Sequence, residues 1–81
     1  MISVLFFAQT RELVDCDGLS LEHKFDSVEA LRAHLAARSD KWALALESGK
    51  LLAAVNQSIV PMDSELKDGD EVAFFPPVTG G

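Results

Sequence analysis

The end of the 81-residue sequence holds the residues best suited to chemistry. The last six positions are Pro76, Pro77, Val78, Thr79, Gly80 and Gly81. The paired prolines favour a stiff, extended exit from the preceding element, and the two terminal glycines place no side chain near the free carboxylate. Such an end can enter a narrow channel, and four extended residues reach roughly 13 Å. The pattern therefore predicts a tail that presents a carboxylate at a distance from the fold.

The carboxylate of Gly81 needs activation before a nucleophile can attack it, because a carboxylate is anionic at neutral pH and a poor electrophile. A mixed anhydride with AMP would supply a good leaving group. The stretch Gly49, Lys50 and Leu51 lacks the upstream glycine and the Ser or Thr of a P-loop, so nothing in the sequence predicts an ATP site. We therefore expect a separate protein to bind ATP and activate the tail.

The composition favours a carrier, an adaptor or a subunit over a self-sufficient enzyme. With 48% hydrophobic and 25% charged residues, the sequence is that of one small globular domain, and one cysteine, two histidines and no tyrosine leave few catalytic groups. A net charge of −6 disfavours nucleic acid as a partner, and no apolar run approaches the roughly 18 residues of a membrane span. A single cysteine cannot form an internal disulfide, which fits a reducing, cytoplasmic location.

The hydrophobic pattern predicts strands on both sides of a helical middle segment. Strands are expected over 2–9, 19–25, 51–55, 59–60 and 71–75. A main helix follows a cap at Asp26 or Ser27, and a shorter helix covers 40–47. The first two strands are expected to form a hairpin with a long connection. This order predicts an α+β domain with one helix packed on one face of the sheet.

Strand alternation predicts an apolar patch on the sheet face that points away from the helix. The outward set includes Leu5, Phe7 and Phe75, and Ile59 is expected to join it. Arg11, just after the first strand, could add an ion pair at the rim of this patch. Loops or the second helix could cover the patch instead. If it is exposed, it would be a docking surface at the root of the tail.

Cys16 and the two histidines are weaker candidates for chemistry. Cys16 could carry a persulfide, but Asp15 and Asp17 flank it and no basic residue adjoins it in the sequence. His23 and His34 have no metal-ligand spacing with the cysteine. The acidic stretch also lacks the further ligands of a calcium loop. We expect no metal site and no persulfide on Cys16.

Three stretches of the sequence together resemble one known family. They are the leading strand V-L-F-F-A at 4–8, the element D-G-D-E-V at 68–72 and the ending F-F-P-P-V-T-G-G at 74–81. The whole chain is similar to the small, ubiquitin-like subunit of molybdopterin synthase (MoaD type). The resemblance implies a β-grasp fold, which is a mixed sheet with one main helix packed on one face and a short second helix. It divides the chain into a β-grasp domain over 1–75 and a flexible Gly-Gly tail over 76–81.

The resemblance also implies a sulfur-carrier role for Gly81. In this family a ubiquitin-activating-type enzyme uses ATP to adenylate the terminal glycine, and a sulfur donor protein converts it to a thiocarboxylate. The large subunit of molybdopterin synthase receives the tail, and the sulfur passes to a cyclic pterin monophosphate to build a dithiolene. The chain itself would bind no permanent cofactor. The catalytic groups would lie in the large subunit of an expected heterotetramer.

Three other functions are compatible with the sequence. The nearest is the sulfur carrier for thiamin thiazole synthesis, which uses the same tail and the same adenylation, although carriers of that type tend to be shorter. The second is a ubiquitin-like protein modifier that forms isopeptide bonds with lysines. The third is an interaction module without chemistry at its end. The expected helical segment 42–46 and the paired prolines favour the molybdopterin pathway.

Overall fold

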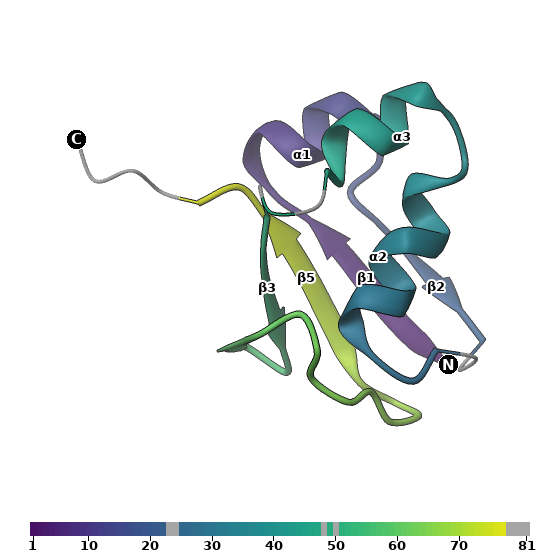
Figure 1. The fold of residues 1–81 in the computed structure, drawn as a ribbon, viewed down its shortest axis with the longest axis vertical. Coiled ribbons are helices and arrows are strands. Elements are labelled where there is room, and N and C mark those ends of the chain that lie inside the picture. Colours follow the sequence, from purple (N-terminus) through teal and green to yellow (C-terminus); the bar gives the residue numbers. More distant parts are fainter. Residues whose placement is uncertain (23–24, 48, 50, 78–81) are drawn as a thin grey trace.

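The computed structural model describes residues 1–22, 25–47, 49 and 51–77. Within these ranges the chain forms five strands and three helices (Figure 1). In chain order they are β1 (Ile2–Phe6), α1 (Ala8–Val14), β2 (Gly18–Leu21), α2 (Val28–Ala36), α3 (Asp40–Ala45), β3 (Leu52–Val55), β4 (Ser58–Val60) and β5 (Glu71–Phe75). Helix α2 lies across one face of the sheet, and α1 and α3 group together beyond the ends of β1 and β5 (Figure 1).

The five strands form a mixed sheet in the order β2-β1-β5-β3-β4. Strands β1 and β5, which come from the two ends of the chain, pair in parallel at the centre, with Val4 opposite Val72. The pairs β1–β2, β3–β4 and β3–β5 are antiparallel. A parallel central pair with a helix across one face is the ubiquitin-like β-grasp arrangement, so the expected fold is confirmed. The strand that leads into the tail therefore lies at the centre of the sheet.

A layer of apolar side chains fills the space between the sheet and α2. Its main members, each at most 1% exposed, are Ile2, Val4, Phe6, Val28, Leu31, Leu35, Ala53, Val72 and Phe74. The members from β1 and β5 alternate along each strand, as the sequence predicts. The apolar side of α2 is buried against the sheet, and the side chain of Ser27, one of the two expected caps, accepts a hydrogen bond from the amide of Ala30 at 3.2 Å.

A seven-residue helix, α1, occupies the connection between β1 and β2. The sequence analysis extends the first strand to residue 9 and expects no helix before β2, and both predictions are wrong. Strand β1 ends at Phe6, and Ala8 has a φ of 53° as the chain turns into the helix. The N-cap Phe7 makes no side-chain cap, and the buried residues of α1 are Thr10 and Val14. A helix so short, with neither a capping residue nor a wide apolar stripe, leaves little signal in the sequence.

Two other elements are shorter than predicted. Strand β2 ends at Leu21 rather than at residue 25, and the ring of Phe25 lies against His34 with a centroid distance of 4.9 Å. Helix α3 ends at Ala45 rather than at residue 47. In the turn before β5, Gly69 has a φ of 92°, where a residue with a side chain would be strained.

A buried arginine joins α2 to the end of α3. Arg32 is 9% exposed, although the sequence places it off the apolar stripe of the helix. Its guanidinium donates two hydrogen bonds of 2.7 Å to the Glu29 carboxylate and one of 2.6 Å to the carbonyl of Leu46. The hydrogen bonds from Arg32 hold the pKa of Glu29 below its ordinary value, against the opposing effect of burial. On α3, the ring of Trp42 lies 4.4 Å from the guanidinium carbon of Arg38.

Candidate functional site

The tail is the predicted site of chemistry, and the structure describes its first two residues. Strand β5 ends at Phe75, after which Pro76 is half-buried and Pro77 is exposed. The remaining tail positions, Val78, Thr79, Gly80 and Gly81, lie outside the described residues. The chemical role of Gly81 therefore stays a prediction. The site that can be described is the surface from which the tail leaves.

Next to the root of the tail, the outward face of the sheet has a hollow of about 420 Å³, which we call the apolar groove. Its lining residues are Leu5, Phe7, Ala54, Gln57, Ile59, Glu71, Ala73 and Phe75. Four of them are paired in one row across four strands: Leu5, Ala73, Ala54 and Ile59. Strands β5 and β3 present alanine in the middle of this row, whereas β1 and β4 present larger side chains at its two ends. The row is therefore hollow at its centre.

Phe7 and Phe75 border the end of the apolar groove next to the tail. The amide of Phe7 donates a hydrogen bond of 3.3 Å to the carbonyl of Phe74, which continues the β1–β5 register and brings Phe7 opposite Phe75. Phe7 is 46% exposed and Ile59 is 69% exposed, whereas Phe74 is fully buried. The predicted residues Leu5, Phe7, Ile59 and Phe75 therefore gather on one open surface. Their role in docking stays a prediction.

Leu52 and Gln57 also lie on this face, and the sequence-based prediction does not include them. Leu52 pairs with Phe75 across β3 and β5, so both side chains lie on the same face, and Leu52 is 37% exposed. Gln57 lines the groove from the turn between β3 and β4. The missing information is the register, because an apolar run over 51–55 does not say which of its residues pairs with Phe75. Glu71 also lines the groove.

Backbone hydrogen bonds fix Glu71 at the start of β5. Its N–H donates to Oδ1 of Asn56 at 3.0 Å, and its carbonyl accepts from the amide of Asn56 at 2.8 Å. The Asn56 side chain also donates to Asp70, whose second carboxylate oxygen accepts from the amide of Lys67 at 2.8 Å. The D-G-D-E-V stretch thus attaches the start of β5 to the turn between β3 and β4. This attachment sets where the Glu71 side chain enters the groove.

Arg11 lies outside the apolar groove. It is an exposed residue of α1, and its Nε is 3.8 Å from a carboxylate oxygen of Asp17. Together with Asp15 and Cys16 it lines a separate hollow of about 370 Å³. The Cys16 thiol donates a hydrogen bond of 3.2 Å to the carbonyl of Gly18. The rim ion pair expected of Arg11 stays a prediction.

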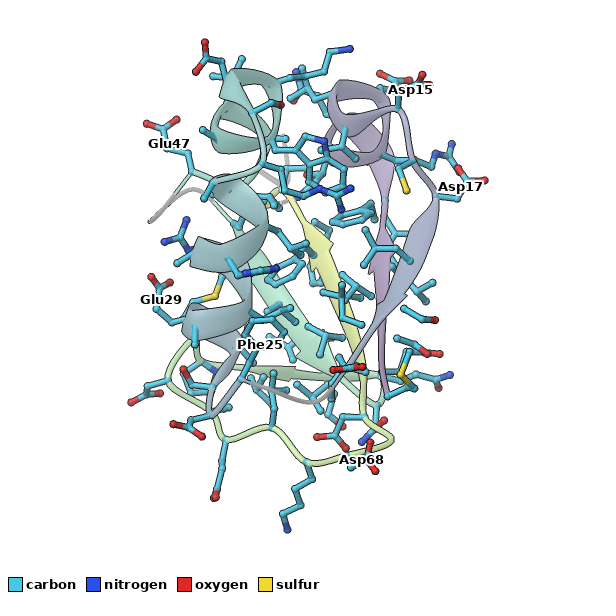
Figure 2. All side chains as sticks on the ribbon, turned by 90° about the vertical axis from the view of Figure 1, so that its right-hand side faces the viewer. Asp15, Asp17, Phe25, Glu29, Glu47 and Asp68 are labelled. Atoms are coloured by element: carbon cyan, nitrogen blue, oxygen red, sulfur yellow. The ribbon has the colours of Figure 1, made fainter. Side chains whose placement is uncertain are left out.

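The acidic side chains are spread over the domain rather than gathered at the groove. Figure 2 labels five acidic residues around the outside of the molecule, Asp15, Asp17, Glu29, Glu47 and Asp68. In the described ranges, no three His, Cys, Asp or Glu side chains come close enough together to hold a metal ion. His34 is exposed on α2, and His23 lies outside the described residues. No helix in the described part of the chain has the length and apolar character needed to cross a membrane.

Comparisons with known proteins agree with this architecture. The chain is 69% identical to the molybdopterin synthase sulfur carrier subunit of Escherichia coli (strain K12) and 63% identical to that of Haemophilus influenzae, with both chains covered completely in each case. One chain in the solved complex of subunits 1 and 2 of molybdopterin-converting factor from Helicobacter pylori superposes with a TM-score of 0.67 at 28% identity, over 99% of this chain and 97% of that one. The ThiS family model matches residues 4–81. With a match over almost its entire length, the chain belongs to the ThiS family.

Proposed function

We propose that this chain is the sulfur carrier subunit of a molybdopterin synthase. The observation that carries the proposal is the full-length identity of 69% to the Escherichia coli protein of that name. The described surface supports it, because β5 is held between β1 and β3 and the tail leaves next to an open apolar groove. A carrier needs a rigid body that a partner can bind and an end that reaches into the partner's active site.

The chemistry of the proposal takes place at Gly81, with ATP bound by a separate adenylating enzyme. A carboxylate oxygen of Gly81 attacks the α-phosphorus of ATP, and pyrophosphate leaves. The terminal sulfur of a persulfide on a donor protein then displaces AMP, and a thiol cleaves the resulting acyl disulfide to leave a thiocarboxylate. Sulfur is a better nucleophile than the carboxylate oxygen it replaces. Its transfer to a cyclic pterin monophosphate builds one half of the dithiolene, so two transfers complete the product.

Three protein partners follow from this chemistry: the adenylating enzyme, the sulfur donor and the large subunit of the synthase. The solved complex of two subunits from Helicobacter pylori supports the large subunit as a partner. The acid and base groups and the pterin pocket belong to that subunit, so this chain supplies the sulfur and a surface to bind. The heterotetramer and the cytoplasmic location stay predictions.

The test is a reconstitution with purified partners. The chain is incubated with ATP, the adenylating enzyme and a sulfur donor, and its intact mass is measured. The expected product has one oxygen replaced by sulfur, and it should then convert the cyclic pterin precursor in the presence of the large subunit. Lysine adducts would indicate a protein modifier instead. A thiocarboxylate that supports thiazole synthesis but no pterin product would indicate the thiamin pathway, and an unchanged chain would indicate an interaction module.

A further inference from the structure

The apolar groove has a polar end, which lies away from the tail. Along β5, Glu71, Ala73 and Phe75 all line the groove from the outward face. Glu71 and Phe75 are four residue steps apart along the strand, a distance of roughly 13 Å. A segment that lies along the groove therefore meets the ring of Phe75 at one end and a carboxylate at the other. The two ends of the groove are chemically different, so they can distinguish the two directions of a bound segment.

Glu71 is half-buried, and its carboxylate has no ion pair or hydrogen bond with the residues that the structure describes. It is also the one charged group among the described residues that line the groove. Covering an ionised carboxylate without a partner removes its hydration and is strongly unfavourable. An occupant of the groove that brings a cation to Glu71 avoids this loss.

Gln57 lines the groove from the turn between β3 and β4, next to the start of β5. Asn56 and Gln57 have φ values of 50° and 72°, so both residues of this two-residue hairpin turn are left-handed. Turns of this kind strongly favour glycine at the second position, because a side chain is strained there. The chain nevertheless has glutamine at this position, and this residue lines the groove. Backbone strain that keeps a side chain at a binding surface points to a use for that side chain.

We propose that Glu71 and Gln57 bind a cationic side chain, arginine or lysine, of the large subunit and so fix the direction in which that subunit lies along the groove. The identity of this partner rests on the proposed function. Charge complementarity carries the inference, since the carboxylate of Glu71 is unpaired in a groove that is otherwise uncharged along its described lining. The apolar part of the same segment covers Ile59 and Phe75. The net charge of −6 also attracts a basic segment during association.

The first test measures the affinity of the chain for the purified large subunit by titration calorimetry at low and high salt. Glu71→Gln should weaken the complex roughly tenfold and reduce its salt dependence, because a charge pair at the interface is lost. Glu65→Gln is the matched control, since it removes the same charge from an exposed residue that does not line the groove. It should leave affinity unchanged. Equal effects of the two substitutions, or no effect of Glu71→Gln, would overturn the proposal.

The second test separates binding from stability at Gln57. Gln57→Gly should raise the midpoint of thermal unfolding, because it removes the strain of the turn, and should still weaken the complex about fivefold through a lost hydrogen bond. A residue with a merely structural role would change the midpoint alone, and that result would overturn the assignment of Gln57. Sulfur transfer by the unchanged chain is measured in parallel. If that transfer fails, the proposed function fails; if it succeeds and both groove variants bind normally, this inference alone is refuted.

Discussion

Four phenylalanines lie at the ends of β1 and β5 or directly after β1, and we expect two of them to stabilise the domain and two to bind partners. Phe6 and Phe74 are 1% and 0% exposed under α2, whereas Phe7 is 46% exposed at the groove and Phe75 is partly exposed beside it. Replacing a buried phenylalanine by alanine costs about 3–5 kcal/mol of stability. Total stability for a chain of this length is about 4–12 kcal/mol. We therefore expect Phe6→Ala and Phe74→Ala to unfold a large fraction of the protein.

Phe7→Ala should behave differently, because about half of its ring is already in contact with water in the free domain. Its loss should cost about 1–2 kcal/mol of stability, and Phe75→Ala should also cost less than either core substitution. In a complex, however, each ring becomes covered, and its removal should weaken binding to both the large subunit and the adenylating enzyme by roughly tenfold or more. The core variants should bind normally in the fraction that remains folded.

The assay for this prediction is chemical denaturation and calorimetric binding on all four alanine variants. Circular dichroism gives the free energy of unfolding, and the folded fraction from that curve corrects the binding data. The reasoning is refuted if Phe7→Ala and Phe75→Ala unfold the domain as strongly as the core variants and bind with unchanged affinity when folded. That result would place the docking surface elsewhere on the domain.

Three further changes test other parts of the molecule. Deleting Gly81, or adding one residue after it, should leave thermal unfolding unchanged and abolish sulfur transfer, since the activated carbon is displaced by the length of a residue; transfer by an extended chain would contradict this. Cys16→Ala should leave pterin synthesis unchanged, and a large loss of product with normal folding would instead favour a persulfide carrier. Glu29→Gln should destabilise the domain at neutral pH and weaken its response to acid. The pKa of Glu29 is lowered in the folded state, so its stabilisation is complete above the ordinary carboxyl pKa and is lost as the pH falls through the folded value. The midpoints of thermal unfolding between about pH 7 and about pH 3 measure this loss. Identical pH profiles for the original protein and the Glu29→Gln variant would show that the pair of Glu29 and Arg32 does not cause the loss of stability in acid.

The sequence predicts the elements whose residues follow a strong period. The stripe of α2 and the capping residue Ser27 are visible in the sequence, and so is the alternation of β1 and β5, because each depends on neighbours a few residues away. Helix α1 depends on Ala8, whose positive φ turns the chain out of the strand. An alanine in the sequence gives no indication of a positive φ. Its position is set by packing against α3, which is distant in the sequence.

The groove and the burial of Arg32 also depend on contacts between segments that are distant in the sequence. The apolar groove exists because Ala54 and Ala73 are paired in the middle of the sheet, and the pairing of β3 with β5 cannot be read from either strand alone. A charged residue is normally expected at the surface. Arg32 is buried because Glu29 and the carbonyl of Leu46 satisfy its guanidinium, and Leu46 belongs to another element. Contacts between distant segments decide these features.

The central position of β5 has a mechanical consequence. A partner that draws in or releases the tail pulls on the chain just after Phe75, along the direction of the strand. The backbone hydrogen bonds from β5 to β1 on one side and to β3 on the other run across the direction of this force. Both sets of hydrogen bonds are therefore loaded together in shear. A strand at the edge of a sheet, held on one side, would separate more easily. If the tail is loaded and discharged repeatedly, as proposed, this arrangement would keep the domain folded while partners pull on its end.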